Sequence, residues 1–160
     1  MPTVNGRGYS EFTPDKETGY EKIMIQHLAI VNQIQKNWVA KKWTGMVKYY
    51  HIDCTSGPGR NPEVSCDGSP TITKRLLAES KLWYRICCIE ENPKSFSNLY
   101  KTLEPYNTNS QSGKISCIGG NYKIEIYNIL NSIRDKNPYG LIYIDENTYP
   151  DWDIVESISI

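Results

Sequence analysis

The sequence predicts an α/β fold in which a mostly parallel sheet is flanked by helices. Four short runs are apolar almost throughout, as expected of strands covered on both faces: residues 49–52, 84–89, 114–118 and 140–144. Helical segments of about ten or more residues separate them, which is typical of crossovers between parallel strands. With right-handed crossovers we expect the spatial order 3-2-1-4, counting the runs along the chain, with the first run central.

The part of the chain before the first run predicts one long helix. Residues 1–18 are rich in Gly, Pro and charge without periodicity, so we expect a loosely ordered lead. Apolar residues at helical spacing over 20–38 predict an amphipathic helix. We therefore divide the chain into a lead with its helix, residues 1–44, and an α/β domain, residues 45–160.

Three further helices are expected between the strands. A polar insertion at 61–67 follows the first strand, and Ser69 is the expected N-cap of a helix that runs to about residue 80. Asn92 followed by proline predicts the cap and first turn of the next helix. The last of the three carries Ile126 and its apolar neighbours and ends before the fourth strand.

Composition excludes several classes of protein. The 160 residues suit one domain. The 18 Lys and Arg balance 18 Asp and Glu, so the net charge does not indicate nucleic-acid binding, although it leaves room for a local basic patch. Five cysteines without a Cys-x-x-Cys motif, and two distant histidines, predict reduced thiols, no metal site and a cytoplasmic protein. No apolar run approaches the roughly 20 residues of a membrane span.

Each predicted strand ends in polar residues. Asp53 is followed by the turn Gly57-Pro58-Gly59, where glycines allow backbone to approach a ligand. Glu90 ends the second strand, where a carboxylate can accept hydrogen bonds from a ribose diol. The third strand ends in Gly119-Gly120-Asn121 and the fourth in Asp145. The carboxyl ends of parallel strands share one edge, so this pattern predicts a nucleotide or adenosyl site there.

This ordered set of motifs resembles the class I S-adenosylmethionine-dependent methyltransferase fold. The order of Asp53 and Gly-Pro-Gly, an insertion, Gly68-Ser69-Pro70 and then Ile89-Glu90 is most similar to the three-Cys-motif partner family of bacterial proteins. The resemblance covers about residues 48–158. It implies a Rossmann-like domain that binds S-adenosylmethionine, without the later strands of the complete methyltransferase fold.

The resemblance also implies roles for individual residues. The loop after the first strand would wrap the methionine end of the cofactor, Glu90 would bind the ribose hydroxyls, and Asn121 and Tyr122 would lie at the adenine. The full set of implied cofactor-binding residues is Asp53, Cys54, Thr55, Gly57, Gly59, Glu90, Glu91, Asn121 and Tyr122.

Asp145 is the implied catalytic residue. It stands where amino-group methyltransferases begin an Asp/Asn-Pro-Pro-aromatic motif, but here Glu146 and Asn147 follow it, which weakens the case for transfer to an exocyclic amine. The expectation is a methyltransferase-like domain whose methyl acceptor the sequence does not identify. A catalytically inactive partner subunit or sensor is the alternative, and the absence of Gly-x-Gly-x-x-Gly opening a helix argues against a nicotinamide-dependent oxidoreductase.

The chain also departs from the family pattern by ending soon after the fourth strand. An exposed fourth strand would leave backbone groups unpaired and one hydrophobic face half covered. We therefore expect a protein partner, or self-association, at the edge formed by residues 140–144.

Overall fold

The computed structural model describes residues 3–4, 7–8, 13–42, 45–61, 65–106, 113–146 and 151–158. The main helices are α1 (Thr13–Ala40), α2 (Ser69–Ser80), α3 (Pro93–Leu103), α4 (Tyr122–Ser132) and α5 (Trp152–Ile158). The main strands are β3 (Lys48–Asp53), β6 (Trp83–Glu90), β7 (Gly113–Gly119) and β8 (Pro138–Tyr143). Shorter elements are β1 (Thr3–Val4), β2 (Arg7–Gly8), β4 (Arg60–Asn61), β5 (Cys66–Asp67) and the 3-10 turn η1 (Glu104–Tyr106).

The four main strands form one parallel sheet in the order β7-β6-β3-β8. The predicted α/β class with a parallel sheet flanked by helices is therefore confirmed. The strand numbers differ from the predicted 3-2-1-4 because four two-residue strands, which the sequence did not indicate, lie outside this sheet in two small antiparallel pairs. In chain order, the main strands lie third, second, first and fourth across the sheet.

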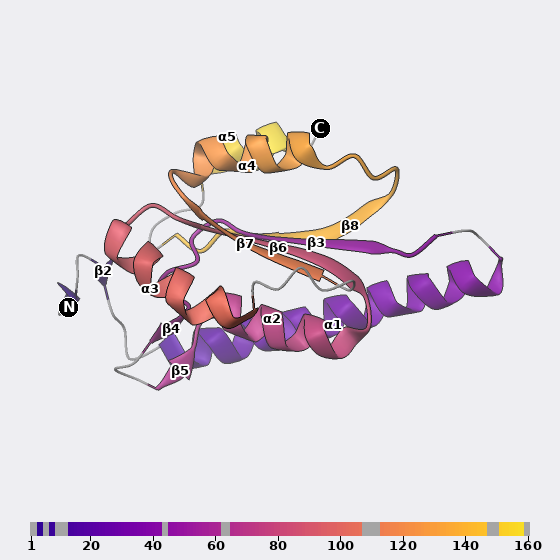
Figure 1. Ribbon diagram of the computed structural model, residues 1–160, viewed down its shortest axis with the longest axis horizontal. Helices are drawn as coiled ribbons and strands as arrows, with labels where there is room; N and C mark the ends of the chain where they lie inside the picture. The colour runs from indigo at the N-terminus through magenta and orange to yellow at the C-terminus, as the bar shows by residue number, and fades with distance from the viewer. Residues whose placement is uncertain are drawn as a thin grey trace.

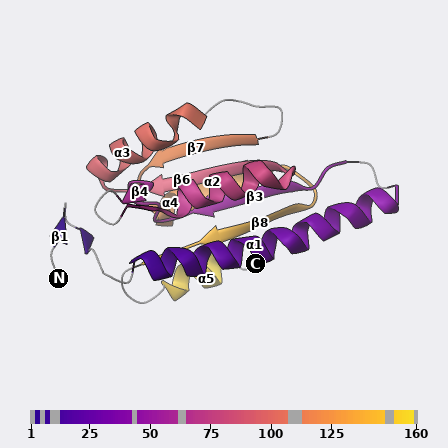
Figure 2. The ribbon, with the colours of Figure 1, turned by 90° about the horizontal axis from the view of Figure 1, so that it is seen from below.

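Helices cover both faces of the sheet (Figure 1). Helices α1, α2 and α3 lie on one face, and α4 and α5 lie on the other. Seen from below, α1 runs alongside β8, on the side of the sheet opposite to β7 (Figure 2). The sheet is therefore the middle layer of three, and each face has its own hydrophobic core.

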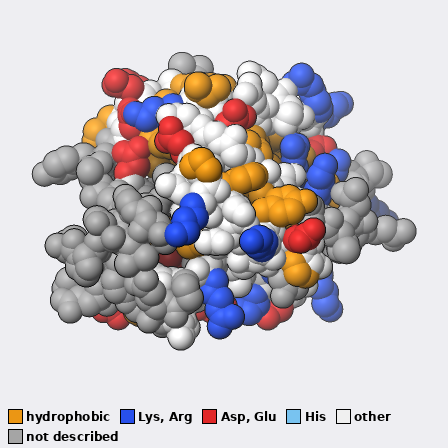
Figure 3. Space-filling model, turned by 60° about the vertical axis from the view of Figure 1, so that its left-hand side comes forward, with side chains coloured by type: hydrophobic (Ala, Val, Ile, Leu, Met, Phe, Trp, Pro, Cys, Tyr) orange, Lys and Arg blue, Asp and Glu red, His pale blue; other side chains and the backbone are white. Residues whose placement is uncertain are grey.

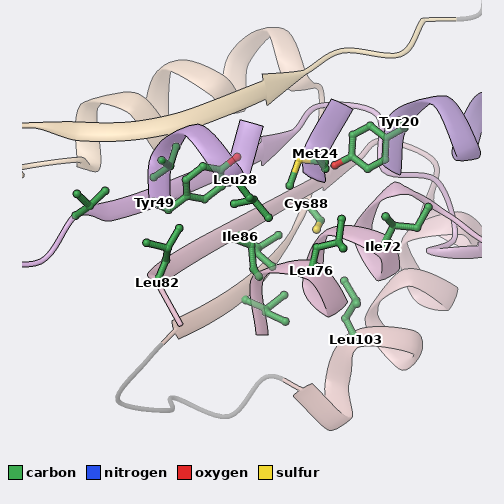
Figure 4. Close-up of a cluster of buried hydrophobic side chains, with 14 of the residues drawn as sticks. Tyr20, Met24, Leu28, Tyr49, Ile72, Leu76, Leu82, Ile86, Cys88 and Leu103 are labelled. Carbon is green, nitrogen blue, oxygen red and sulfur yellow. The ribbon is translucent and has the colours of Figure 1, made fainter. Parts of the chain in front are cut away.

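The larger core lies between the sheet and α1, α2 and α3 (Figure 4). Met24 of α1, Tyr49 of β3, Leu77 of α2 and Ile86 of β6 are fully buried in it. The smaller core joins the other sheet face to α4 and α5. Its buried members are Ile52, Cys54, Cys87, Ile89, Tyr122, Ile126, Ile129 and Ile154.

Helix α1 begins earlier than predicted, and its first turns make both local and long-range contacts. The expected loose lead over 1–18 is wrong for residues 13–18, which are helical. Thr18 Oγ1 donates to Pro14 O at 2.9 Å, and Lys16 pairs with Asp145 beyond the end of β8. Local periodicity does not reveal an ion pair between residues so far apart along the chain.

The expected N-cap of α2 was wrong by one residue. Gly68 is the N-cap, and the Ser69 hydroxyl instead donates to Asp53 Oδ2 at 2.6 Å. A buried carboxylate is the stronger acceptor for that hydroxyl, which explains the diversion. By contrast, the predicted Asn92 cap of α3 is confirmed, since its side chain accepts from the backbone N–H groups of Lys94 and Ser95.

Strand β8 is covered only in part, as its position at the sheet edge led us to expect. Tyr139, Leu141 and Tyr143 pack against the larger core, and Ile142 packs against the smaller one. Each of these side chains is only partly buried, which agrees with the expected half-covered hydrophobic face. The outer edge of β8 pairs with no other described strand.

Charged side chains of both signs are interspersed on the side of the molecule in Figure 3, and hydrophobic side chains reach the surface between them. Of the helices whose residues the structure describes, none has the length and hydrophobicity needed to cross a membrane.

Candidate functional site

The order in which the chain adds strands to the sheet reverses between β3 and β8. From β3 the chain moves through α2, β6 and α3 to β7 on one side, and α4 then carries it over the other face to β8. In open α/β sheets, ligands bind outside the carboxyl ends of the strands at such a switch point. Here that point lies between the ends of β3 and β8, next to Asp53 and Asp145.

The loop after β3 is fixed to both neighbouring strands. Cys54 N donates to Tyr143 O at 2.8 Å, and Ser56 N donates to Ile89 O at 3.0 Å. Thr55 Oγ1 donates to Asp145 O at 3.1 Å and accepts from Asp145 N at 2.9 Å. The loop is therefore held in place across the switch point before any ligand binds.

The glycines of this loop have different environments. Gly57 has φ +63° and Gly59 has φ +77°, a region that disfavours residues with a Cβ atom. The Gly59 carbonyl accepts from Gly68 N at 3.0 Å and from Thr71 Oγ1 at 2.7 Å, and a Cβ atom at Gly59 would lie 3.2 Å from Leu99. Gly59 thus packs the loop against α2 and α3, so its contacts serve the fold.

Asp53 is completely buried at the end of β3. Its carboxylate accepts from Ser69 Oγ at 2.6 Å and from Thr55 N at 3.3 Å. Burial raises its pKa from 3.8 to about 6 against the effect of these hydrogen bonds, and the Asp145 charge adds to the rise. A buried anion of this kind favours a cation nearby.

The first turns of α1 add charged residues that the sequence analysis missed. Lys16 pairs with Asp145. Burial raises the pKa of Glu17 from 4.5 to about 7, and Asp145 and Asp53 raise it further while Lys16 opposes them. The sequence Thr13-Pro14-Asp15 at this point is a helix-start signal that could have placed these residues correctly.

Tyr20, one turn of α1 after Lys16 and Glu17, holds this helix against the sheet. Its hydroxyl forms hydrogen bonds with Thr73 and with His51 Nε2, the latter at 3.1 Å, and its ring lies 4.4 Å from that of Tyr143. Burial lowers the pKa of His51 to about 3, so this histidine is neutral and serves the packing of α1 and α2 on β3.

The end of β6 presents two carboxylates in different settings. Glu90 is 1% exposed and its Oε1 accepts from Asn92 N at 2.7 Å. Glu91 is exposed, and its Oε1 accepts from Asn121 Nδ2 at 3.4 Å. The end of β7 lies close by, since Gly120 N donates to Glu90 O at 3.2 Å.

The remaining implied cofactor residues have structural partners. The Asn121 amide oxygen, expected at the adenine, accepts from Lys123 N at 2.9 Å and caps α4. Tyr122 is buried and its hydroxyl bonds to Glu146. Cys54 is also buried in the smaller core, where burial raises the pKa of its thiol to about 12.

The structure thus brings Asp53, Thr55, Glu90 and Asp145 to one edge, and adds Glu17 from α1. The local excess of carboxylates suits a positively charged ligand. Among the described residues, no group of three or more His, Cys, Asp or Glu side chains is arranged to hold a metal ion. Asn147, where the chain departs from the methyltransferase motif, lies outside the described residues, as do residues 148–150.

No protein-family model matches this chain, and no curated protein matches it. The fold is consistent with the Rossmann-like class of parallel α/β domains.

Proposed function

We propose that the protein binds S-adenosylmethionine at the carboxyl ends of β3 and β6, as a methyltransferase-like domain. The observation that carries this proposal is the group of carboxylates from Glu17, Asp53 and Asp145 at the switch point between β3 and β8. The sulfonium and ammonium groups of this cofactor are cations, which such carboxylates favour.

The start of α2 supports a cationic ligand over a dinucleotide. In dinucleotide-binding folds, a pyrophosphate lies at the N-terminus of the helix that follows the first strand. Here the Asp53 carboxylate is bonded to Ser69 in the first turn of that helix. A pyrophosphate would meet this buried carboxylate, with Glu17 and Asp145 close by, and like charges repel.

Glu90 is the residue that we assign to the ribose. It ends the strand next to β3, which is the position from which a carboxylate reaches a ribose diol in adenosyl-binding folds. Asn92 N fixes one of its oxygens. The carboxylate is nearly fully covered, so the ribose reaches it only if the covering residues move on binding.

Calorimetric titration tests this proposal. S-adenosylmethionine and S-adenosylhomocysteine should bind, and NAD should not, because its negatively charged pyrophosphate would meet the buried Asp53 carboxylate. Binding of NAD alone, or of none of the three, would overturn the proposal.

One observation favours binding without catalysis. Asp145, the implied catalytic residue, is engaged by Lys16 through its side chain and by Thr55 through its backbone. Transfer of labelled methyl groups to DNA, RNA and protein from a cell extract distinguishes the two functions. An enzyme should transfer the label and lose turnover far more than cofactor affinity in Asp145→Asn, whereas an inactive partner or sensor should bind the cofactor and transfer nothing.

A further inference from the structure

Basic residues gather at the opposite edge of the sheet, where the strands begin. Side chains alternate along a strand, and Ile86 and Ile115 point into the larger core, so Arg85 and Lys114 point to the face that α4 covers. Arg85 Nη1 donates to Ser132 Oγ at the end of α4, at 3.2 Å. The basic patch on this face consists of Lys48, Trp83, Arg85, Lys114, Arg134 and Lys136.

The arrangement of these cations is unfavourable for the isolated protein. Arg85 and Lys114 are direct neighbours in the register of β6 and β7, and like charges at such positions repel. One acid, Asp135, lies between Arg134 and Lys136, and it already accepts from Lys48 Nζ at 2.7 Å and from the Tyr50 hydroxyl. The charges of Arg85, Lys114 and their neighbours are therefore available to an external anion.

An aromatic ring lies within the patch. Lys48 Nζ is 5.3 Å from the centre of the Trp83 ring, and the Tyr50 ring meets Trp83 edge-on at 5.8 Å. Trp83 is half-buried, so part of its ring remains accessible. Cations beside an accessible aromatic ring suit single-stranded nucleic acid, whose phosphates pair with the cations and whose bases stack on the ring.

We propose that the basic patch binds single-stranded nucleic acid, independently of the site at the carboxyl edge. The two edges are separated by the length of β3, six residues or about 20 Å. A membrane surface fits less well, because insertion into lipid needs exposed apolar side chains, and the exposed large hydrophobic residues of the described chain do not belong to the patch.

Fluorescence anisotropy with a short labelled oligonucleotide of mixed sequence, as single-stranded DNA, single-stranded RNA and duplex DNA, tests the proposal over a range of salt concentrations. The variant Lys114→Gln/Lys136→Gln removes two exposed cations. Lys22→Gln/Lys94→Gln makes the same change in net charge on α1 and α3 and is the matched control. Vesicles containing phosphatidylserine provide the membrane comparison.

We expect tighter binding to one or both single strands than to the duplex. The slope of log K against log salt concentration should fall in magnitude by about 1.4 in the patch variant, about 0.7 for each of the two lost phosphate contacts. Trp83→Ala should weaken binding by about 5- to 150-fold, equivalent to loss of one stacked base. Absence of binding at low salt, equal loss in the control variant, equal affinity for the duplex, or binding to vesicles alone would each overturn the proposal.

Discussion

Ser69 Oγ donates a hydrogen bond of 2.6 Å to Asp53 Oδ2, and so joins the first turn of α2 to the end of β3. Both residues are buried. The bond holds a carboxylate at the start of a helix, where the helix dipole also favours negative charge. It links the packing of α2 directly to the electrostatics of the candidate site.

Ser69→Ala should therefore destabilise the protein by about 1–3 kcal/mol, because it leaves a buried carboxylate oxygen without this donor. Denaturant unfolding measures the change. Ser97→Ala, at an exposed position on α3, is the control and should have little effect. Equal stability of the two variants would mean that the Ser69 hydrogen bond contributes nothing measurable.

Two glycines should respond to alanine with opposite signs. Gly19 lies within α1 and a Cβ atom there would meet no atom within 4 Å, so Gly19→Ala should stabilise the protein by about 0.5–1 kcal/mol. Gly57 has φ +63°, so Gly57→Ala should destabilise it by about 1–2 kcal/mol. Thermal unfolding of both variants is the test, and the same sign for both would contradict the backbone conformations described above.

The raised pKa of Glu17 predicts how stability depends on pH. The folded protein keeps a proton on Glu17 up to a pKa of about 7, whereas the unfolded chain releases it near 4.5. Stability is therefore lost as the pH rises across this window, because the unfolded state binds fewer protons there. At pH 8 the Glu17 carboxylate is ionised and partly buried, so Glu17→Gln, which has no charge, should be more stable than the unmodified protein. We expect a gain of about 1–2 kcal/mol, which is modest because solvent reaches part of this side chain and screens its charge.

Denaturant midpoints at pH 4 and pH 8 measure this effect. Asp15→Asn removes an exposed carboxylate from the same part of α1 and is the matched control. A pH profile that Glu17→Gln leaves unchanged would show that neither burial nor the charges of Asp145 and Asp53 raise the pKa of Glu17.

Glu90→Gln should weaken binding of S-adenosylmethionine by about 1–3 kcal/mol, or about 5- to 150-fold in Kd, because hydrogen bonds to a neutral amide are weaker than those to a carboxylate. The amide oxygen can still accept from Asn92 N, so the local fold should persist. Calorimetric titration measures the affinity, with Glu79→Gln near the end of α2 as the control. An unchanged Kd in Glu90→Gln would remove Glu90 from the ribose site.

The sequence predicted those features that depend on local pattern. The four apolar runs located all the main strands, and Asn92 located the start of α3, because a cap and a following proline act within a few residues. The start of α1 was missed although Thr13-Pro14-Asp15 is a local helix-start signal, whereas the pairing of Lys16 with Asp145 has no local signal. Ser69 was misassigned because its acceptor lies on β3, far away in the sequence.

The candidate site was predictable only in part. The acids at the strand ends could be identified because parallel strands end at one edge, as Asp53 and Glu90 do. The contribution of Glu17 depends on how α1 crosses the sheet, which no local signal encodes. The structural use of Gly59 follows from packing against α2 and α3, whereas the Asn121 cap of α4 is a local signal that the assignment of Asn121 to the adenine overlooked.

The most direct test of the proposed function is heteronuclear NMR of the backbone amides during titration with S-adenosylmethionine. We predict chemical-shift changes concentrated in residues 53–59, 90–91 and 119–122, with smaller changes at Lys16 and Glu17 as the ligand's cation approaches Asp145. Amides at the basic patch, on the far edge of the sheet, should remain unchanged. Absence of shifts at saturating ligand, or shifts confined to residues outside the carboxyl edge, would contradict the proposal that this edge binds the cofactor.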